Sequence, residues 1–335
     1  MPARHATART FDRTRFACVA VSVCLAMQGC PPRAEGERAA ADPSAQAIET
    51  ERESAVAAFV ELIALHNANA AALAEFESQG VVELRRPDGD GGQRFDQCDL
   101  DASIAPAGRG SVRLKKASET LAWIGSDGSS AWAFLMQEKP PRAVVFEGLR
   151  DASFARPEGA SGSDVWPLLS PESLRILLGI AEVPPAYRLL RLPGADVLKP
   201  IETRYELEWE IAPSLRAAMR FGADRRPSEV LLRGADGVLV ARSELSEPVR
   251  ARAENLAQGA WPTVARKIGI VAPRLDGRAD IFLGEPTAMI RRAKPHFFDF
   301  EELQRRIRPE QVEFISRPKP PETNPDGAKP RVESP

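Results

Sequence analysis

Histidine and tyrosine are scarce in this sequence, and the common catalytic motifs are missing. Only His5, His66 and His296 occur among 335 residues, with two tyrosines. Neither His66 nor His296 has a His or Cys neighbour at metal-ligand spacing, which argues against zinc. The chain also lacks a Gly-x-Ser-x-Gly nucleophile motif, a Walker loop and a dinucleotide-binding fingerprint. We therefore assign no catalytic residue, no metal and no cofactor, and expect a protein that is not an enzyme.

Cysteine is almost absent beyond the first thirty residues. Cys18, Cys24 and Cys30 lie near the start, and only Cys98 lies further along. Once the leading segment is removed, Cys98 has no second interior cysteine with which to pair. We expect a small, half-buried thiol at Cys98 rather than a disulfide framework.

There is no excess of charge of either sign. The chain carries 45 Lys and Arg against 47 Asp and Glu, a formal net charge of -2. A nucleic-acid-binding surface needs a basic stripe to neutralise phosphates. This composition therefore predicts no nucleic-acid partner, and its 43% hydrophobic and 27% charged residues are typical of a globular domain.

The most informative segment is a short apolar run that ends at a cysteine. Basic residues precede Phe16–Met27, which is too short to span a bilayer, where about 20 apolar residues are needed. The following Gln28-Gly29-Cys30 resembles a bacterial lipobox, in which the cysteine is acylated by chains such as palmitate. The alternative is an ordinary secretory signal, because Met27 and Gln28 depart from the usual pattern. The basic residues are Arg4, Arg9, Arg13 and Arg15.

Composition divides the rest of the chain. We expect a signal peptide over 1–29 and a lipidated N-terminus with a flexible linker over 30–48. A single half-barrel domain is expected over 49–316, followed by a disordered Pro-rich tail over 317–335. Pro31 replaces the Asp that retains some lipoproteins at the inner membrane, so we expect anchoring at the periplasmic face of the outer membrane.

Hydrophobic periodicity predicts a mainly β fold with a few helices (α+β). Apolar residues at three- and four-residue steps predict a helix over 50–78, and shorter helices are expected over 170–178 and 299–306. Most of 81–292 alternates with period two, and Asp-Gly pairs mark hairpin turns. We expect a curved antiparallel sheet, an incomplete β-barrel, wrapped around the helices.

The strand over 203–211 shows the alternation most clearly. Its apolar residues share one face, and Glu206, Glu208 and Glu210 share the other, which we expect to be solvated. The apolar faces of this and two other strands are either core or the lining of an acyl-chain cavity, and the pattern does not distinguish the two. The candidate lining residues are Trp132, Phe134, Met136, Tyr205, Leu207, Trp209, Met219 and Phe221.

One tract resembles a known family. Leu121–Leu135, then Pro140-Pro141 and Val144–Phe146, resemble the LolA/LolB-like outer-membrane lipoprotein carriers, with a strand, a Gly-Ser turn and a Trp-x-aromatic strand in this order. The resemblance implies an incomplete barrel around helices and a hydrophobic cavity that receives lipoprotein acyl chains. Cys30 makes the chain more similar to the anchored acceptor, LolB, although no residue matches that protein's protruding apolar loop.

Together these features predict a lipid-anchored lipoprotein of the bacterial cell envelope. Its partners would be the membrane, through the anchor, and lipid or lipoprotein acyl chains in the cavity, with a role in lipoprotein sorting. The first alternative is a structural or scaffold lipoprotein with the same fold and no ligand. The second is a periplasmic hydrolase with a carboxylate or Ser cluster at the barrel mouth.

Overall fold

The computed structural model describes residues 43–87, 92–138, 140–147, 166–196, 198–273 and 277–315. The expected signal peptide, the lipidation at Cys30 and the tail over 317–335 lie outside these ranges. The chain separates into two compact units, Met1–Gln46 and Ala47–Pro335.

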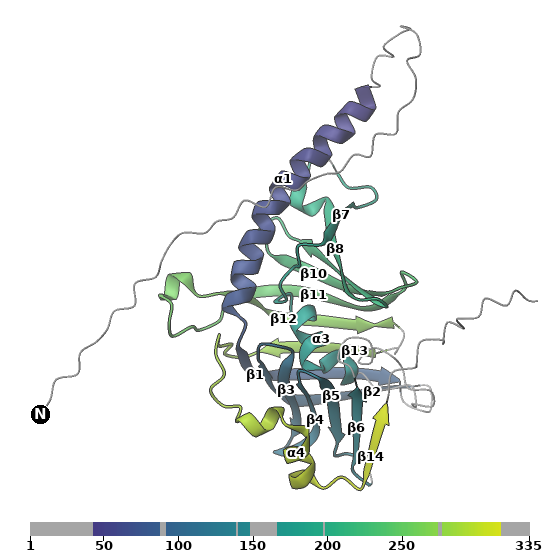
Figure 1. Ribbon diagram of the computed structural model, residues 1–335, viewed down its shortest axis with the longest axis vertical. Helices are drawn as coiled ribbons and strands as arrows, with labels where there is room; N and C mark the ends of the chain where they lie inside the picture. Colours follow the sequence, from purple (N-terminus) through teal and green to yellow (C-terminus); the bar gives the residue numbers. More distant parts are fainter. Residues whose placement is uncertain are drawn as a thin grey trace, which may run out of the picture. The chain divides into compact units, whose positions relative to one another are not determined.

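The fold is one continuous curved sheet, seen edge to edge in Figure 1. Its order is β14-β6-β5-β4-β3-β2-β1-β13-β12-β11-β10-β9-β8-β7, and every pair is antiparallel except β14 with β6. Because β14 and β7 are edge strands that do not pair with each other, the sheet stays open. The strands are β1 (Phe76–Pro87), β2 (Gln93–Ile104), β3 (Arg109–Lys116), β4 (Glu119–Asp127), β5 (Ser130–Leu135), β6 (Arg142–Glu147), β7 (Tyr187–Arg191), β8 (Tyr205–Ala212), β9 (Leu215–Phe221), β10 (Pro227–Gly234), β11 (Leu239–Arg250), β12 (Thr263–Ala272), β13 (Gly277–Leu283) and β14 (Gln311–Ile315).

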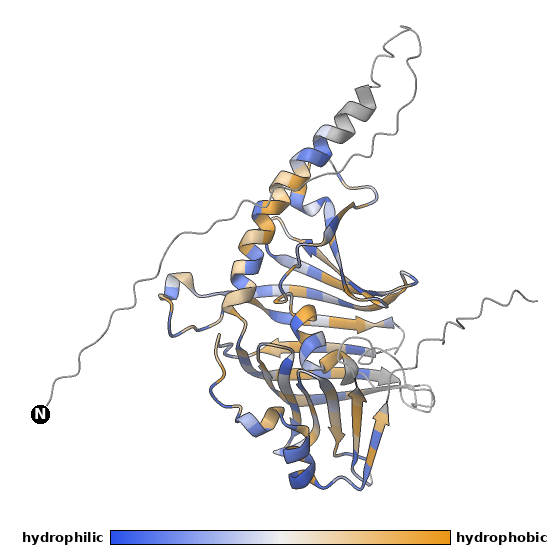
Figure 2. Ribbon diagram, viewed as in Figure 1, coloured by the Kyte–Doolittle hydropathy of each residue, from blue (hydrophilic) through white to orange (hydrophobic). Residues whose placement is uncertain are grey.

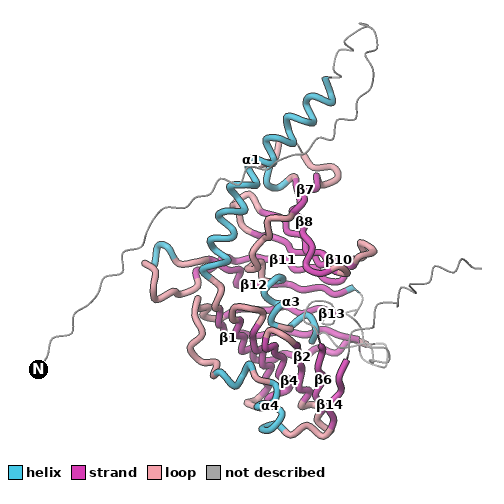
Figure 3. The backbone as a smooth tube through the Cα atoms, viewed as in Figure 1, coloured by secondary structure: helices cyan, strands magenta, loops and turns pink. Residues whose placement is uncertain are grey.

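Helices are few, as Figure 3 shows. Ser170 caps α3 by accepting a hydrogen bond from the Ser173 N–H, with Pro171 at the first helical position, as the sequence predicts. This helix contacts β2, β3 and β4 and also β10, so it lies within the curve between the two halves of the sheet. The helices are α1 (Pro43–Ala72), α3 (Pro171–Leu177) and α4 (Phe300–Ile307), with 3₁₀ turns η1 (Trp166–Leu169), η2 (Ile201–Thr203), η3 (Gln258–Ala260) and η5 (Pro295–Phe298).

The prediction of a helix over 50–78 is wrong at the C-terminal end. The helix stops at Ala72 and β1 begins at Phe76, where Phe76 pairs with Ile104 of β2 and the Glu77 backbone with Thr287. Pairing with two distant segments here overrides the local helical pattern. The helix also begins at Pro43, inside the stretch expected to be linker.

Helix α1 is apolar on most of its circumference. Thr50–Ala72 is long and apolar enough to meet the length and composition criterion for a membrane span. Its inward side chains, however, lie in the protein core with the strands: Phe59 and Leu62 are buried and join Leu174 and Leu177 of α3 in one main cluster. Figure 2 shows the apolar residues alternating along the strands beside these helices.

The prediction that the glutamate face of β8 is solvated is wrong for two of its three glutamates. Glu206 is 3% exposed, with Arg220 at 2.8 Å and Arg233 at 2.5 Å, while Glu208 is also buried and pairs with Arg233 at 3.6 Å. Burial alone would raise the pKa of Glu206, but the hydrogen bonds and charges of Arg233 and Arg220 outweigh it and lower the pKa. Only Glu210 is exposed as expected. Arginines from neighbouring strands cover this face, which a single-strand pattern cannot show.

Candidate functional site

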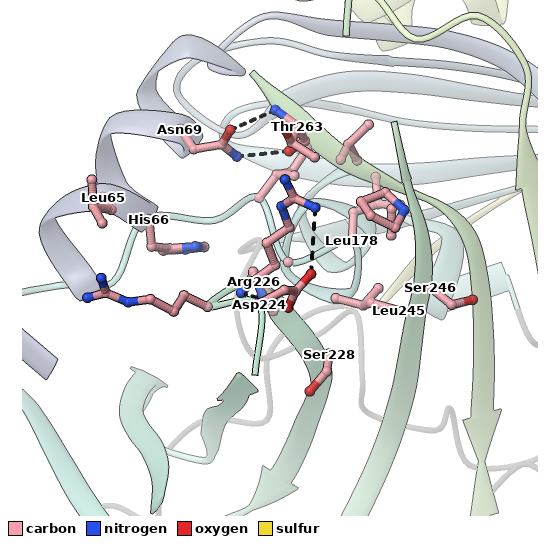
Figure 4. Close-up of a pocket in the computed structure, with 17 residues that line it drawn as sticks. Leu65, His66, Asn69, Leu178, Asp224, Arg226, Ser228, Leu245, Ser246 and Thr263 are labelled. Atoms are coloured by element: carbon pink, nitrogen blue, oxygen red, sulfur yellow. Dashed lines mark hydrogen bonds and ion pairs between the residues drawn. The ribbon is translucent and has the colours of Figure 1, made fainter. Parts of the chain in front are cut away.

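A cavity of about 400 Å³ lies between helix α1 and the strands of one half of the sheet (Figure 4). Leu65, His66 and Asn69 of α1 form one side of it. The segment after α3, the β9–β10 turn and parts of β11 and β12 form the rest. Its volume lies near the lower end of the roughly 300–1,000 Å³ typical of small-molecule sites. The residues of these other lining segments are 178–180, 224–228, 245, 246, 248 and 263–265.

Polar side chains hold α1 in place as a wall of this cavity. The Asn69 amide donates to the Thr263 carbonyl at 2.9 Å and accepts from the Thr263 N–H at 2.7 Å, as Figure 4 shows. Asn67 makes the same pair of bonds with Val183, both at 2.9 Å. Each amide thereby satisfies two backbone groups that would otherwise be unpaired near the core. The wall is therefore preformed rather than assembled around a ligand.

His66 is buried, not part of a polar helix face as its neighbours suggested. Its Nε2 lies 2.8 Å from the Ala181 carbonyl oxygen, and because that oxygen can only accept, Nε2 carries the proton. The ring also contacts Phe221 edge-on, with centroids 5.9 Å apart. Burial lowers the pKa of His66 despite the Ala181 hydrogen bond and the charge of Glu182, which act in the opposite direction. The imidazole is therefore neutral near pH 7.

Apolar side chains of the lining come from the segment after α3, from β11 and from β12, among other elements. Leu178, Leu245 and Val264 contribute aliphatic side chains to it. Gly179 has φ of +65°, and a Cβ there would lie 2.8 Å from Leu245 Cδ1, so the chain turn after α3 depends on glycine. Leu245 therefore packs close to the end of α3, next to the cavity.

The β9–β10 turn brings two cations to the cavity. Arg225, at φ of +62°, reaches Glu61 of α1 at 3.3 Å and Glu202 of η2 at 3.5 Å. Arg226 pairs with Asp224 at 3.6 Å, and Figure 4 shows that pair beside the cavity. The turn is closed by the Gly222 N–H, which donates to the Arg226 carbonyl at 2.8 Å. The lining therefore combines aliphatic side chains with guanidinium groups.

A second cavity, of about 500 Å³, lies near the end of α1, the β2–β3 turn and α3. Its lining includes the backbone of 104–109 and the charged side chains of Glu172, Arg175 and Glu182. Burial lowers the pKa of Arg175, whose guanidinium donates to the Ala74 carbonyl at 3.2 Å. It offers fewer aliphatic side chains than the cavity beside α1, which we therefore take as the candidate site.

The eight residues predicted to line an acyl cavity fall into two clusters, and none of them lines the cavity beside α1. One cluster, which includes three of the eight, packs against Leu303 and Phe300 of α4 and also contains Ala143 and Val145 of β6. The other five lie in the main core, where Phe221 contacts His66 from behind the cavity wall. The first group is Trp132, Phe134 and Met136, and the second is Tyr205, Leu207, Trp209, Met219 and Phe221.

Alternation shows that two faces of a strand differ, but not which element covers each face. The lining residues that the sequence interpretation missed include Asn69 and the 224–228 turn. The available signal was the run of polar residues His66, Asn67 and Asn69 within an otherwise apolar helix, where buried polar groups imply specific partners.

Comparisons with known proteins return similar folds only. No protein-family model matches the chain, and no curated protein matches it in sequence. Among solved structures, the chain is similar to a domain from Vibrio parahaemolyticus, provisionally described as an outer membrane lipoprotein-sorting protein domain. The identity is 11%, over 73% of this chain and 97% of that one, with a TM-score of 0.43.

Two further structures are similar at the same level. A DUF1329 family protein from Desulfovibrio piger is 15% identical, over 72% of this chain and 99% of that one, with a TM-score of 0.43. A LolA superfamily protein from Nitrosomonas europaea is 14% identical, over 67% and 90%, with a TM-score of 0.39. The open curved sheet expected from the sequence is confirmed by the strand order, in which β14 and β7 are separate edges.

Proposed function

We propose that this chain is a lipid-anchored lipoprotein of the bacterial envelope that binds an acyl chain in the cavity beside α1 and takes part in lipoprotein sorting. The observation that carries the proposal is the cavity itself, whose lining includes Leu178, Leu245 and Val264. Concave sites with apolar walls and few polar groups are the usual form of small-molecule sites. Its function would be binding and transfer, without catalysis.

The preformed wall supports binding. Because Asn67 and Asn69 already fix α1 to Val183 and Thr263, little ordering would be needed when a ligand enters. Ordering costs subtract from affinity, so a preformed site binds more tightly for the same contact area. Phe221 lies behind His66 in the packed core. An acyl chain too long for the cavity would have to displace such packed side chains.

The proposed anchor fits the position of the domain along the chain. Twelve residues, 31–42, separate Cys30 from the first residue of α1. Fully extended, they reach at most about 40 Å. An acylated Cys30 would thus hold the domain close to the membrane from which a chain is taken or to which it is delivered. The expected location is the periplasmic face of the outer membrane.

A scaffold lipoprotein without a ligand is the second candidate. The close packing of the aromatic residues favours it, since Trp132 and Phe134 are fully buried rather than open to a ligand. It differs from the first proposal in one measurable respect, because a scaffold with a filled core binds no acyl chain.

The test is the binding of a fluorescent fatty-acid probe to the chain that begins at residue 31. Ala265→Phe would place a ring in the cavity from β12, and we expect at least a tenfold loss of affinity. Val271→Phe is the matched control on the same strand, because Val271 does not line the cavity and should leave affinity unchanged. Absence of probe binding by the unmodified chain would support the scaffold instead.

A further inference from the structure

The lining of the cavity beside α1 combines charged and aliphatic residues. Its charged lining residues are Asp224, Arg225 and Arg226, all on the β9–β10 turn. They carry two positive charges and one negative charge. The aliphatic groups of Leu178, Leu245 and Val264 come from other elements. A ligand with one polar and one apolar part would find partners for both in this lining.

Arg226 is the guanidinium with hydrogen-bonding capacity to spare. Its side chain is 51% exposed, and its ion pair with Asp224 is long, at 3.6 Å from Nη1 to Oδ2. Exposed pairs of this kind are weak, so an incoming anion can compete for the guanidinium. With five N–H donors in a planar fork, an arginine can hold a carboxylate or phosphate through two parallel hydrogen bonds.

Arg225 is more firmly engaged than Arg226. It bridges Glu61 on α1 and Glu202 on η2, and so ties the turn to the helix that walls the cavity. These two carboxylates offset its charge, and its ion pairs hold the turn in position. The hydroxyl-bearing residues Ser228 and Ser246 also line the cavity and can accept or donate to a head group.

We propose that the ligand is an amphiphile with one apolar chain and an anionic head, a carboxylate or a phosphate, whose head group binds Arg226. This inference rests on the proposed acyl-chain binding and adds the class of ligand. The cavity volume, near the lower end for ligand sites, suits one chain rather than several. The aliphatic side chains of the lining would contact the acyl chain, and Arg226 on the β9–β10 turn would bind the head group.

The experiment compares head groups at constant chain length. Palmitate, cetyl alcohol and cetylamine are each used to displace a fluorescent acyl probe from the chain that begins at residue 31, at mildly alkaline pH. We expect palmitate to bind about tenfold more tightly than cetyl alcohol, which corresponds to about 1.4 kcal/mol, and cetylamine to bind most weakly. Inorganic phosphate alone forms a fourth arm.

Variants test whether Arg226 on the β9–β10 turn causes the preference for palmitate over cetyl alcohol. In Arg226→Gln, the ratio of palmitate to cetyl-alcohol affinity should fall toward one. Arg266→Gln is the matched control, since Arg266 is exposed on β12 and does not line the cavity, and it should keep the ratio. Circular dichroism and thermal unfolding check that both variants fold, and raised salt should reduce the ratio in the unmodified chain.

The outcomes separate this inference from the proposed function. Equal affinity for palmitate and cetyl alcohol, or a preference for cetylamine, would overturn the anionic head group and leave acyl-chain binding intact. Failure of all three amphiphiles to displace the probe, or of the probe to bind, would overturn acyl-chain binding itself. If inorganic phosphate displaced the fluorescent probe as strongly as palmitate does, the site would bind a free anion, and the inference would be overturned.

Discussion

At the scale of single residues, one buried carboxylate organises the segment between β13 and α4. Glu77 on β1 is 6% exposed and accepts hydrogen bonds from three successive backbone N–H groups, those of Arg291, Arg292 and Ala293, at 3.0–3.1 Å. Ser103 donates its hydroxyl to the same carboxylate at 3.1 Å. The three backbone donors lie more than two hundred residues away from Glu77 along the chain.

Glu77→Gln should destabilise the protein by about 1–3 kcal/mol, because the new amide would point N–H groups at backbone donors and leave them unsatisfied. Urea unfolding of the two proteins measures the difference. Glu75→Gln is the matched control, since Glu75 is exposed two residues earlier and its change should stay within about 0.5 kcal/mol. Equal stability of the Glu77 variant and the unmodified protein would contradict this account.

His66 makes stability depend on pH. Because its pKa is lowered in the folded state, the unfolded chain binds a proton more readily, and stability present above the ordinary pKa is lost as the pH falls. We expect the free energy of unfolding to decrease from neutral pH to about pH 5, and the decrease to be smaller in His66→Gln. Burial and the charges of Arg306 and Lys294 also lower the pKa of His296, so His296→Gln and the double variant measure its separate part of the slope. If His66→Gln keeps the slope of the unmodified protein, the burial of His66 does not set it.

At the scale of elements, the C-terminal arm, residues 295–315, closes one face of the sheet. Phe297 of η5 lies against Trp123 and Arg113, with centroid distances of 5.0 and 4.7 Å, and Phe300 of α4 stacks on Phe134 at 5.5 Å. Strand β14 then adds to β6 in parallel. A helix and an edge strand together therefore cover the aromatic residues of β5.

Leu303 is the fully buried residue of α4 within this arm. Leu303→Ala should cost roughly 2–5 kcal/mol in the free energy of unfolding, because it leaves a cavity beneath the helix. Arg305→Ala is the control on the same helix, where the side chain is 72% exposed and contributes little. Thermal or urea unfolding with tryptophan fluorescence measures both. Equal losses in the two variants would mean that the arm does not pack as described.

The sequence predicted elements better than their partners. The helix over 299–306 and the strand alternation around β8 were predicted, because each follows from a local period. Strand β14 was not, since five residues directly before a Pro-rich stretch carry little local signal and its stability comes from pairing with β6, 169 positions away along the chain from Gln311 to Arg142. The burial of the glutamates of β8 was not predicted for the same reason, because the arginines that pair with them lie on β9 and β10.

At the scale of the whole molecule, α3 and the inner side of α1 share one core with strands from both halves of the sheet. The sheet order places β1 beside β13, so the first and the last of the antiparallel strands join its two halves. The cavity lies beside the C-terminal part of α1, where Asn69 bonds to the backbone of Thr263 on β12.

The sequence by itself determined the kinds of element, the near-neutral net charge and the candidate anchor at Cys30, because each depends on local period, composition or a short motif. Only the tertiary structure decided that Trp132 and Phe134 face α4, that Glu206 is buried beneath arginines, and that His66 and Asn69 wall a cavity. Those outcomes depend on which distant segment covers each face, and alternation along one strand carries no information about its neighbours.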